Sequence, residues 1–313
     1  MPKFSVIIPL YNKEKHIVAT LQSIFAQTVT NYEIIIINDG STDGSLQVVQ
    51  NLQDARIKLF SIKNQGVSTA RNYAMQHAKG EYYAFLDADD IWLENHLEEL
   101  NKLITHFPDC GMYCTAYQKQ ISEKIVINAQ FNNITPNHFG IVNDFFLSSI
   151  NSCIAWTSAT CVNRIVFNTV KQFDNKITLG AGEDTDLWIR IALYYPVAFT
   201  NNSTAIHNQI ADNRISNSNT LKRNFINLDK YNPYIKKHAN LKLFLDVNRY
   251  SLALQFLIAC DKEKYVFYKS NIDFKNLTKK QLFLLHQNKT TLKIFYKIKK
   301  VMSKFGFILN SYS

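Results

Sequence analysis

The first ninety residues alternate between two hydrophobic periodicities, and this alternation restricts the fold more than any other feature of the chain. Short apolar runs rich in β-branched residues predict strands, and stretches with apolar residues at helical spacing predict helices. The predicted strands are Phe4–Pro9, Glu33–Asn38, Ile57–Ile62 and Tyr82–Asp87, and the predicted helices between them are Glu14–Gln27, Asp43–Leu52 and Val67–His77. Strands and helices in strict alternation indicate an α/β fold with a mostly parallel sheet and helices on both faces.

Aromatic and acidic side chains follow three of these four strands. Pro9 and Tyr11 follow the first, Asp39 the second, and Asp87 the fourth. Because ligands of such sheets bind beyond the carboxyl ends of the strands, we expect these residues to line one site. Tyr11 is suited to flank a nucleotide base, and Asp39 to accept a hydrogen bond from a base or a ribose. Arg71, one turn into the third helix, is placed to reach the base or the phosphates.

The fourth strand runs into Asp87-Ala88-Asp89-Asp90. Two carboxylates on one turn can hold a hard cation such as Mg²⁺ or Mn²⁺, with water and phosphate oxygens completing its shell. Such an ion would neutralise charge on a departing nucleotide diphosphate. A solvated turn is the alternative for an isolated acidic triplet, but the position at a strand end favours the metal site.

A second acidic pair, Glu183-Asp184, follows the glycine-rich turn at 180–182 and opens a helix predicted over 184–194. Glycines allow the backbone to approach a ligand closely, so the pair is placed to meet a bound molecule. Capping of the helix N-terminus is the alternative, and the two roles are compatible. Asp186 and Arg190, one helical turn apart, are expected to form a structural ion pair.

The rest of the chain divides less clearly. We expect a helix at 94–107, paired strands within 111–127, a loop with a short helix over 132–158, and a short strand at 198–202. The Asn- and Ser-rich stretch 201–219 is the predicted boundary. The domains are then 1–218, with one half at 1–92 that holds the strand-end residues and another at 93–218 that holds the second acidic pair, followed by a basic helical region at 219–313.

Four segments together resemble family 2 of the inverting glycosyltransferases, which have the GT-A fold, over about residues 4–215. The segments read FSVIIPLYN, EIIIINDGSTDGS, NQGVSTARNYAMQHAKGEYYAFLDADD and GAGEDTDLWIRIAL. The resemblance implies an enzyme that transfers a sugar from a nucleotide-sugar, with a UDP-sugar favoured, onto a glycan or lipid-linked glycan such as lipopolysaccharide or capsule. By position, it implies that Pro9, Tyr11, Asp39, Arg71, Asp87 and Ala88 bind the donor, that Asp89 binds Mn²⁺ or Mg²⁺, and that Asp184, with Glu183, supplies the base.

Two further residues are assigned by the same resemblance. His207 lies where related enzymes often carry a histidine that binds the metal or the diphosphate, although the basic residue usual beside it is missing from Ile206-His207-Asn208. Trp156 lies in the segment that covers the acceptor in relatives, where it can stack on a sugar or pack into the core.

Charge is divided unevenly along the chain. Residues 1–219 contain 16 Lys and Arg against 20 Asp and Glu, whereas residues 220–313 contain 19 against 5. Within the basic part, Ile294, Ile298, Val301, Met302 and Phe305 share one face of a predicted helix at 289–305, and Lys293, Lys297, Lys300 and Lys304 share the other. This pattern fits a helix lying on an anionic membrane, and equally an amphipathic helix that covers the catalytic domain.

The sequence shows no signal peptide and no apolar stretch of membrane-spanning length, and its five cysteines are odd in number. We therefore expect a cytoplasmic protein with reduced thiols, peripheral on the inner face of the plasma membrane if the basic helix binds lipid. Cys110 and Cys114 are expected to fill the core rather than to bind a metal.

Other functions fit less well. The glycine-rich loop of nucleotidyltransferases and dinucleotide oxidoreductases is absent after the first strand, where Leu10-Tyr11-Asn12 stands. A non-enzymatic protein that binds nucleic acid or another polyanion is an alternative suggested by the charge, but residues 1–219 are net acidic and no nucleic-acid partner is expected. An inactive glycosyltransferase homologue is the other alternative. The presence of both the base carboxylate and the metal-binding carboxylate argues against it.

Overall fold

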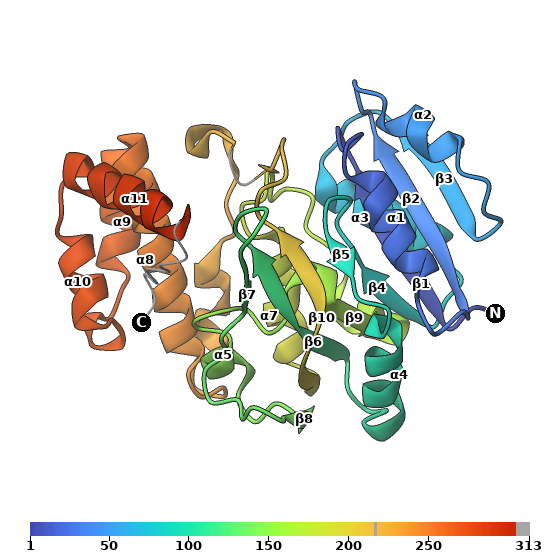
Figure 1. The fold of residues 1–313 in the computed structure, drawn as a ribbon. Helices are drawn as coiled ribbons and strands as arrows, with labels where there is room; N and C mark the ends of the chain where they lie inside the picture. The colour runs from blue at the N-terminus through green and yellow to red at the C-terminus, as the bar shows by residue number, and fades with distance from the viewer. Residues whose placement is uncertain (216–217, 305–313) are drawn as a thin grey trace.

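The computed structural model describes residues 1–215 and 218–304, and the strands found there form one sheet. The strands are β1 (Phe4–Leu10), β2 (Tyr32–Asp39), β3 (Ile57–Ile62), β4 (Tyr82–Phe85), β5 (Ile91–Trp92), β6 (Met112–Gln120), β7 (Val126–Asn128), β8 (Phe139–Ile141), β9 (Thr160–Asn163) and β10 (Val197–Asn208). Along the sheet their order is β3-β2-β1-β4-β9-β6-β10-β5, with β7 on β6 and β8 on β10. One continuous sheet therefore joins the two halves of residues 1–218 (Figure 1).

Helices cover both faces of this sheet. The last four helices gather on the side of the molecule away from β1–β3 (Figure 1). The helices are α1 (Ile17–Phe25), α2 (Ser45–Gln50), α3 (Val67–His77), α4 (His96–His106), α5 (Phe145–Ser148), α6 (Phe167–Val170), α7 (Glu183–Ala192), α8 (Leu241–Ala259), α9 (Lys262–Ser270), α10 (Lys279–Leu285) and α11 (Lys289–Lys304). Helices α8–α11 form the orange and red group in Figure 1. The predicted α/β class, with a C-terminal helical region, is confirmed.

The first four strands follow the predicted pattern closely. β3, β2, β1 and β4 pair in parallel. Successive isoleucines of β2 point to opposite faces, so Ile34 and Ile36 pack with α1 while Ile35 and Ile37 pack with α3. This explains the run of four isoleucines, because a strand covered on both faces has no solvent side to keep polar. The fourth strand ends two residues earlier than predicted, at Phe85, and releases the acidic turn beyond it.

Strand β10 differs from prediction, because it continues to Asn208 instead of ending at residue 202. Its polar residues are accommodated by internal hydrogen bonds. The buried Thr204 hydroxyl donates to the Thr115 hydroxyl on β6 at 2.8 Å, and His96 Nδ1 lies 2.7 Å from the same Thr204 oxygen. His207 is therefore in a strand, although residues 201–208 are rich in Asn and Ser. The domain boundary proposed nearby stays a prediction.

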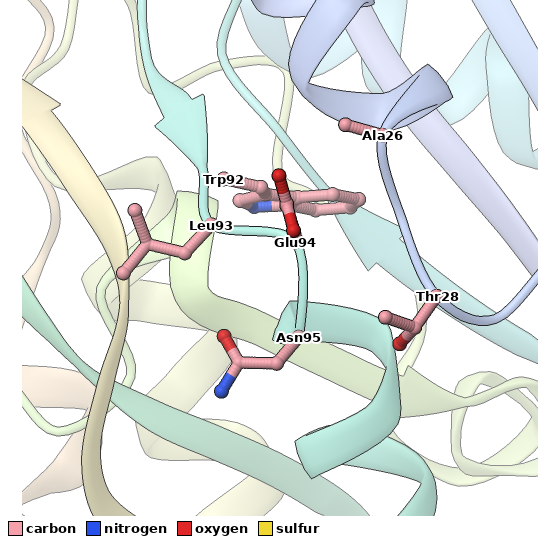
Figure 2. A pocket seen from close by; sticks show the side chains of 6 residues that line it. All are labelled: Ala26, Thr28, Trp92, Leu93, Glu94 and Asn95. Carbon is pink, nitrogen blue, oxygen red and sulfur yellow. The ribbon is translucent and has the colours of Figure 1, made fainter.

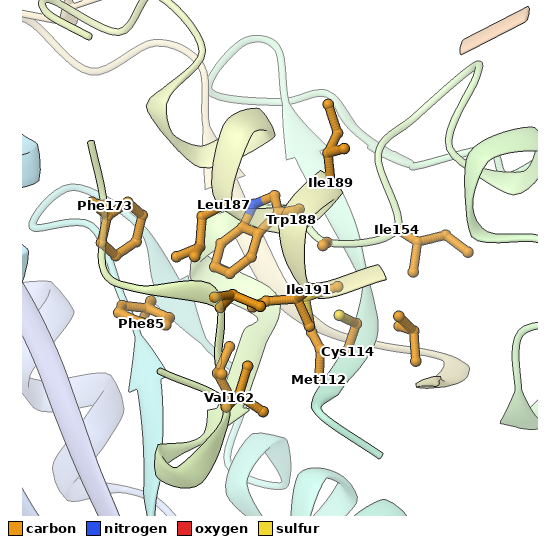
Figure 3. Close-up of a cluster of buried hydrophobic side chains, with 14 of the residues drawn as sticks. Phe85, Met112, Cys114, Ile154, Val162, Phe173, Leu187, Trp188, Ile189 and Ile191 are labelled. Atoms are coloured by element: carbon orange, nitrogen blue, oxygen red, sulfur yellow. The ribbon is translucent and has the colours of Figure 1, made fainter. Parts of the chain in front are cut away.

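A cluster of large aromatic side chains fixes α7 against the sheet (Figure 3). The rings of Phe85, Phe173 and Trp188 lie 5.5–6.0 Å apart, measured between centroids. Trp188 is 1% exposed. Packing of this kind holds the first turn of α7 in a fixed position beside the end of β4.

Two further features of the structure concern the cysteines and the helices. All five cysteines are free, and both Cys110 and Cys114 are buried. Among the residues described, no helix is both long and apolar enough to cross a membrane.

Candidate functional site

A pocket of about 520 Å³ opens at the carboxyl ends of the parallel strands. All the residues singled out from the sequence line it: Pro9, Tyr11, Asp39, Arg71, Asp87, Ala88, Asp89, Trp156, Glu183, Asp184 and His207. They come from the strand ends, α3, the first turn of α7, the end of β10 and the segment before β9. The convergence of Pro9, Tyr11, Asp39 and Asp87 was predicted from topology, and the role of each residue stays a prediction.

The second hollow of the surface has a different character (Figure 2). It lies between the end of α1 and residues 92–95, over the ring of Trp92. Its walls are joined by backbone contacts, because Thr28 N donates to Glu94 O at 3.0 Å. Glu94 is its only charged lining residue. This hollow follows from the packing of α1 on β5 and lacks the converging charged groups of the pocket at the strand ends.

Asp39 lies at the end of β2 and is 4% exposed. Its two carboxylate oxygens accept hydrogen bonds from the backbone N–H groups of Gln65 and Gly66, at 2.8 and 2.9 Å. Burial raises the pKa of Asp39, and these two bonds oppose the rise. Gly66 has a φ of 92°, a conformation that favours glycine, and this turns its N–H toward the carboxylate. Asp39 thus presents fixed acceptor oxygens beside the half-exposed ring of Tyr11.

Arg71 connects the two acidic parts of the pocket. Its side chain is 4% exposed, and Nη2 lies 2.7 Å from Asp87 Oδ1 while Nη1 lies 3.8 Å from Glu183 Oε1. The guanidinium also lies over the ring of Phe173, at 5.2 Å. Burial alone would lower the pKa of Arg71, but the charges of Asp87 and Glu183 raise it. Arg71 was expected to reach the base or phosphates, and in this structure its contacts are with these carboxylates.

The turn at 87–90 is held from three directions. Asp89 Oδ2 accepts from Lys13 Nζ at 2.7 Å. The buried Asp90 accepts from the Ser158 hydroxyl at 2.6 Å and from Asn208 N at 2.9 Å. Burial raises the pKa of Asp90, and the charges of Asp89 and Asp87 add to the effect. Asp90 therefore ties the turn to the segment before β9 and to the end of β10.

The acidic pair at the start of α7 divides into a buried and a more accessible member. Glu183 is 5% exposed, and burial, together with the charge of Asp184, raises its pKa to about 7. Asp184 is half-buried and accepts from Thr185 N at 2.6 Å, with the Thr157 hydroxyl at 3.5 Å. Gly182, at a φ of 100°, makes the turn into the helix. Both carboxylates line the pocket, which suits the more accessible Asp184 to take a proton from a bound hydroxyl.

His207 and Trp156 form an aromatic wall on the remaining side. Their rings stack at 4.9 Å, and the other neighbour of Trp156 is Tyr117 at 4.5 Å. Burial, reinforced by the charge of Arg214, lowers the pKa of His207 to about 3. The imidazole is therefore neutral, and its Nε2 accepts from Arg214 Nη2 at 3.1 Å.

The chemistry of the turn at 87–90 fits a divalent cation, because carboxylate oxygens are the ligands that hard cations prefer. Among residues 1–215 and 218–304, however, no three His, Cys, Asp or Glu side chains are grouped closely enough to hold a metal by themselves. The Lys13 ammonium contacts Asp89 directly. These residues thus fit an ion that is held by one or two carboxylates and completed by phosphate oxygens of a substrate.

Sequence reasoning missed two cationic residues of this pocket, Lys13 and Arg214. Lys13 follows Tyr11 by two positions, just beyond the end of β1 at Leu10. That position was a signal in the sequence that Lys13 could line the pocket. Arg214 lies in the segment after β10, and no local pattern relates it to His207. Lys13 also donates to the carbonyl oxygens of Asp212 at 2.7 Å and Asn213 at 3.3 Å, which joins that segment to the acidic turn.

Comparisons with known proteins identify relatives of this chain. The chain is 30% identical over 295 residues, 88% of its length, to an uncharacterized glycosyltransferase of Rickettsia felis. It spans only 44% of that relative's length. It is 32% identical over 195 residues, 61% of this chain and 70% of the relative, to the Escherichia coli enzyme UDP-Glc:alpha-D-GlcNAc-diphosphoundecaprenol beta-1,3-glucosyltransferase WfaP.

Solved structures show the same fold. Staphylococcus aureus TarS 1–349, in complex with UDP-GlcNAc, matches with a TM-score of 0.57 and 17% identity over 88% of this chain and 74% of that one. The mannosyltransferase PcManGT from Pyrobaculum calidifontis, in complex with GDP-Man and Mn²⁺, matches with a TM-score of 0.55 and 17% identity over 86% and 74%. These likenesses identify the fold as GT-A. The family model of glycosyl transferase family 2 matches residues 5–165, about half of the sequence, and the chain therefore belongs to this family.

Proposed function

We propose that the pocket binds a nucleotide-sugar, of which a UDP-sugar is favoured, and transfers its sugar to a hydroxyl of a lipid-linked glycan with inversion at the anomeric carbon. The observation that carries the proposal is that two separate acidic groups, the turn at 87–90 and the pair at 183–184, open into one pocket with the buried Arg71 between them. The turn at 87–90 suits a metal ion that binds the donor diphosphate. The pair at 183–184 suits the acceptor hydroxyl.

The donor is placed by the residues at the strand ends. Tyr11 offers a ring face to the base, and Asp39 offers two acceptor oxygens that its backbone bonds hold in place. The names of the relatives support a UDP-sugar, since WfaP is named for UDP-Glc and TarS is seen with UDP-GlcNAc. Asp89 and Asp87 would hold Mg²⁺ or Mn²⁺, which when bound offsets the negative charge of the leaving diphosphate. The Mn²⁺ in PcManGT supports this choice of ion.

In the transfer step, Asp184 accepts the proton of the acceptor hydroxyl. The freed oxygen forms its bond to the anomeric carbon from the face opposite the diphosphate, the bond from that carbon to the phosphate oxygen breaks, and the electron pair leaves with the nucleoside diphosphate. Lys13 and Arg214 line the pocket and add positive charge near the leaving group. A single displacement of this kind inverts the anomeric configuration.

The proposed acceptor is carried by a membrane lipid, which WfaP's name supports, and α11 suggests how the protein reaches it. Ile294, Ile298 and Val301 of this helix are 51%, 45% and 54% exposed. These three residues of the predicted apolar face are therefore exposed, whereas Met302 is half-buried and Phe305 lies outside the described residues. We propose that this face, flanked by lysines, lies on the cytoplasmic leaflet of an anionic membrane, so that the protein is cytoplasmic and peripheral.

The test of the activity is a panel of nucleotide-sugars, assayed for release of the nucleoside diphosphate with Mn²⁺ and with EDTA. The expected result is that one donor is turned over with Mn²⁺ and that EDTA abolishes this turnover. If none is turned over and calorimetry detects no binding of UDP, the proposed function is wrong. The membrane contact is tested separately by comparing how the parent and the double variant Ile294→Ser/Ile298→Ser bind phosphatidylglycerol vesicles. Undiminished binding by the variant would exclude this face of α11 as the membrane contact.

A further inference from the structure

The turn at 87–90 already has a cation of the protein itself beside it, the ammonium of Lys13. This ammonium lies 2.7 Å from Asp89 Oδ2, and the side chains of Lys13 and Asp89 are only 11% and 15% exposed. Within residues 1–215 and 218–304, the Asp89 carboxylate has no other hydrogen bond or ion pair. The carboxylate that we propose as a ligand of Mg²⁺ or Mn²⁺ is therefore paired with an internal cation in this structure.

The backbone that carries Lys13 is held in an uncommon conformation. Asn12 has a φ of 52°, which is rare outside glycine, although Asn tolerates it better than most residues. Two bonds to the loop after β2 fix it there: Asn12 N donates to the Ser41 hydroxyl at 3.1 Å, and Asn12 Oδ1 accepts from Thr42 N at 2.7 Å. Lys13 N donates to the Ser45 hydroxyl at 2.7 Å. This backbone directs the lysine into the pocket, and strain held by several bonds is typical of functional positions.

The ammonium of Lys13 has three hydrogens to donate and three acceptors around it. Besides Asp89, the carbonyl oxygens of Asp212 and Asn213 accept from it at 2.7 and 3.3 Å. These carbonyls belong to the segment after β10, which a second contact holds in place, because His16 Nε2 lies 3.0 Å from Asp212 Oδ1. If another cation took Asp89, Lys13 would keep two partners and its place in the pocket. One N–H would then be free for an anion.

An ammonium and a divalent cation cannot share Asp89 without repelling each other. Water screens this repulsion poorly at side chains as buried as these. A nucleoside diphosphate would offset it, because its phosphate oxygens can bind the metal ion and also accept the free N–H of Lys13. Metal ion and donor should therefore each raise the affinity of the pocket for the other.

We propose that Lys13 is an exchangeable counter-ion of Asp89. It pairs with the carboxylate in the ligand-free protein and yields it to the divalent cation that enters with the donor, so that the affinity for the metal ion stays low until a diphosphate is present. This rests on the proposed function, since the cation and the diphosphate are those of the proposed donor complex. A purely structural ion pair predicts the opposite, because its loss would loosen the turn and lower the affinity for the metal ion.

The test measures Mn²⁺ binding by electron paramagnetic resonance, in which free Mn²⁺ gives a sharp signal that is lost on binding, without nucleotide and with saturating UDP. Without UDP, Lys13→Met should bind Mn²⁺ about tenfold more tightly than the parent, on the scale of a typical coupling between two sites. Lys13→Arg keeps the positive charge and should bind Mn²⁺ as weakly as the parent. UDP should raise the Mn²⁺ affinity of the parent by a larger factor than that of Lys13→Met.

Lys15→Met is the matched control, because it removes the same charge from the same loop. Lys15 is 78% exposed and pairs with Asp212 Oδ2 at 3.4 Å instead of with the turn at 87–90. This variant should bind Mn²⁺ as the parent does, and thermal melting should show that all variants are folded. Lys13→Gln, which is neutral but keeps donors for the carbonyls, should gain Mn²⁺ affinity as Lys13→Met does, and it replaces that variant if Lys13→Met does not fold.

The inference is wrong if neutral variants of Lys13 bind Mn²⁺ without UDP no more tightly than the parent, or if Lys15→Met gains as much. The proposed function fails by a different result, namely that the parent binds no UDP with or without Mn²⁺. If the parent binds UDP together with Mn²⁺ but the neutral variants gain no Mn²⁺ affinity, this inference alone is refuted.

Discussion

Replacing Glu183 by Gln should change how the stability of the protein depends on pH. Glu183 is 5% exposed, and burial, with the nearby charge of Asp184, raises its pKa from 4.5 to about 7, against the opposing charge of Arg71. A raised pKa means that the folded protein holds this proton more tightly than the unfolded chain does. The stabilisation is therefore complete below about pH 4.5 and is lost as the pH rises to about 7.

The magnitude follows from the two pKa values. Between pH 5 and pH 8 this carboxyl lowers the free energy of unfolding of the parent by roughly 2–3 kcal/mol, which Gln cannot do. Urea unfolding of parent and Glu183→Gln at both pH values measures the difference between them. That difference should shift by roughly 2–3 kcal/mol in favour of the variant at pH 8. Glu123→Gln, which changes an exposed carboxylate, should show no such shift.

The result that would refute the reasoning is an equal difference between parent and Glu183→Gln at pH 5 and pH 8. It would mean that Glu183 is charged at both values and that its burial is offset by Arg71. Loss of the cooperative transition in the variant would be a different outcome. It would assign Glu183 a structural role as partner of Arg71.

Three other substitutions test separate parts of the structure. Asp184→Asn should reduce sugar transfer at least a thousandfold, on the scale of a lost general base, yet bind UDP within about twofold of the parent by calorimetry; lost UDP binding would contradict the role of base. Asp90→Ala should lower the free energy of unfolding by about 1–3 kcal/mol and raise the Mn²⁺ concentration needed for half-maximal rate, because the turn loses its bonds to Ser158 and Asn208. Asp90→Asn, which can still bond both partners, should keep most of the stability and most of the Mn²⁺ affinity. Trp188→Ala should cost about 3–5 kcal/mol in urea unfolding, since the ring is 1% exposed, and a cost below 1 kcal/mol would show that the cluster repacks.

The sequence predicts those parts of the site that depend on local pattern. Each strand end could be located because the apolar run stops there, and parallel topology then brings Tyr11, Asp39 and Asp87 to one pocket. The same reasoning located the first turn of α7, within one residue of its start.

Other features depend on contacts between distant segments, which local pattern does not encode. The extension of β10 past residue 202 is stabilised by a buried hydrogen bond between Thr204 and Thr115, so its polar composition gave a misleading signal. Arg214 meets His207 only because the segment after β10 folds back. Helical periodicity showed that α11 is amphipathic, but it could not show that Ile298 would be left exposed.

The bonds of Asp90 have a consequence for how the protein folds. This one carboxylate joins residues 68 and 118 positions away along the chain, so these two of the bonds that hold the acidic turn form only after β9 and β10 have joined the sheet. Contacts of such long sequence separation form slowly, because the loops they close cost entropy before any bond is gained. A fragment that ends at residue 92 contains every strand end of the nucleotide side but lacks both partners of Asp90. During synthesis, the proposed donor site should therefore remain incomplete until the ribosome has released residue 208.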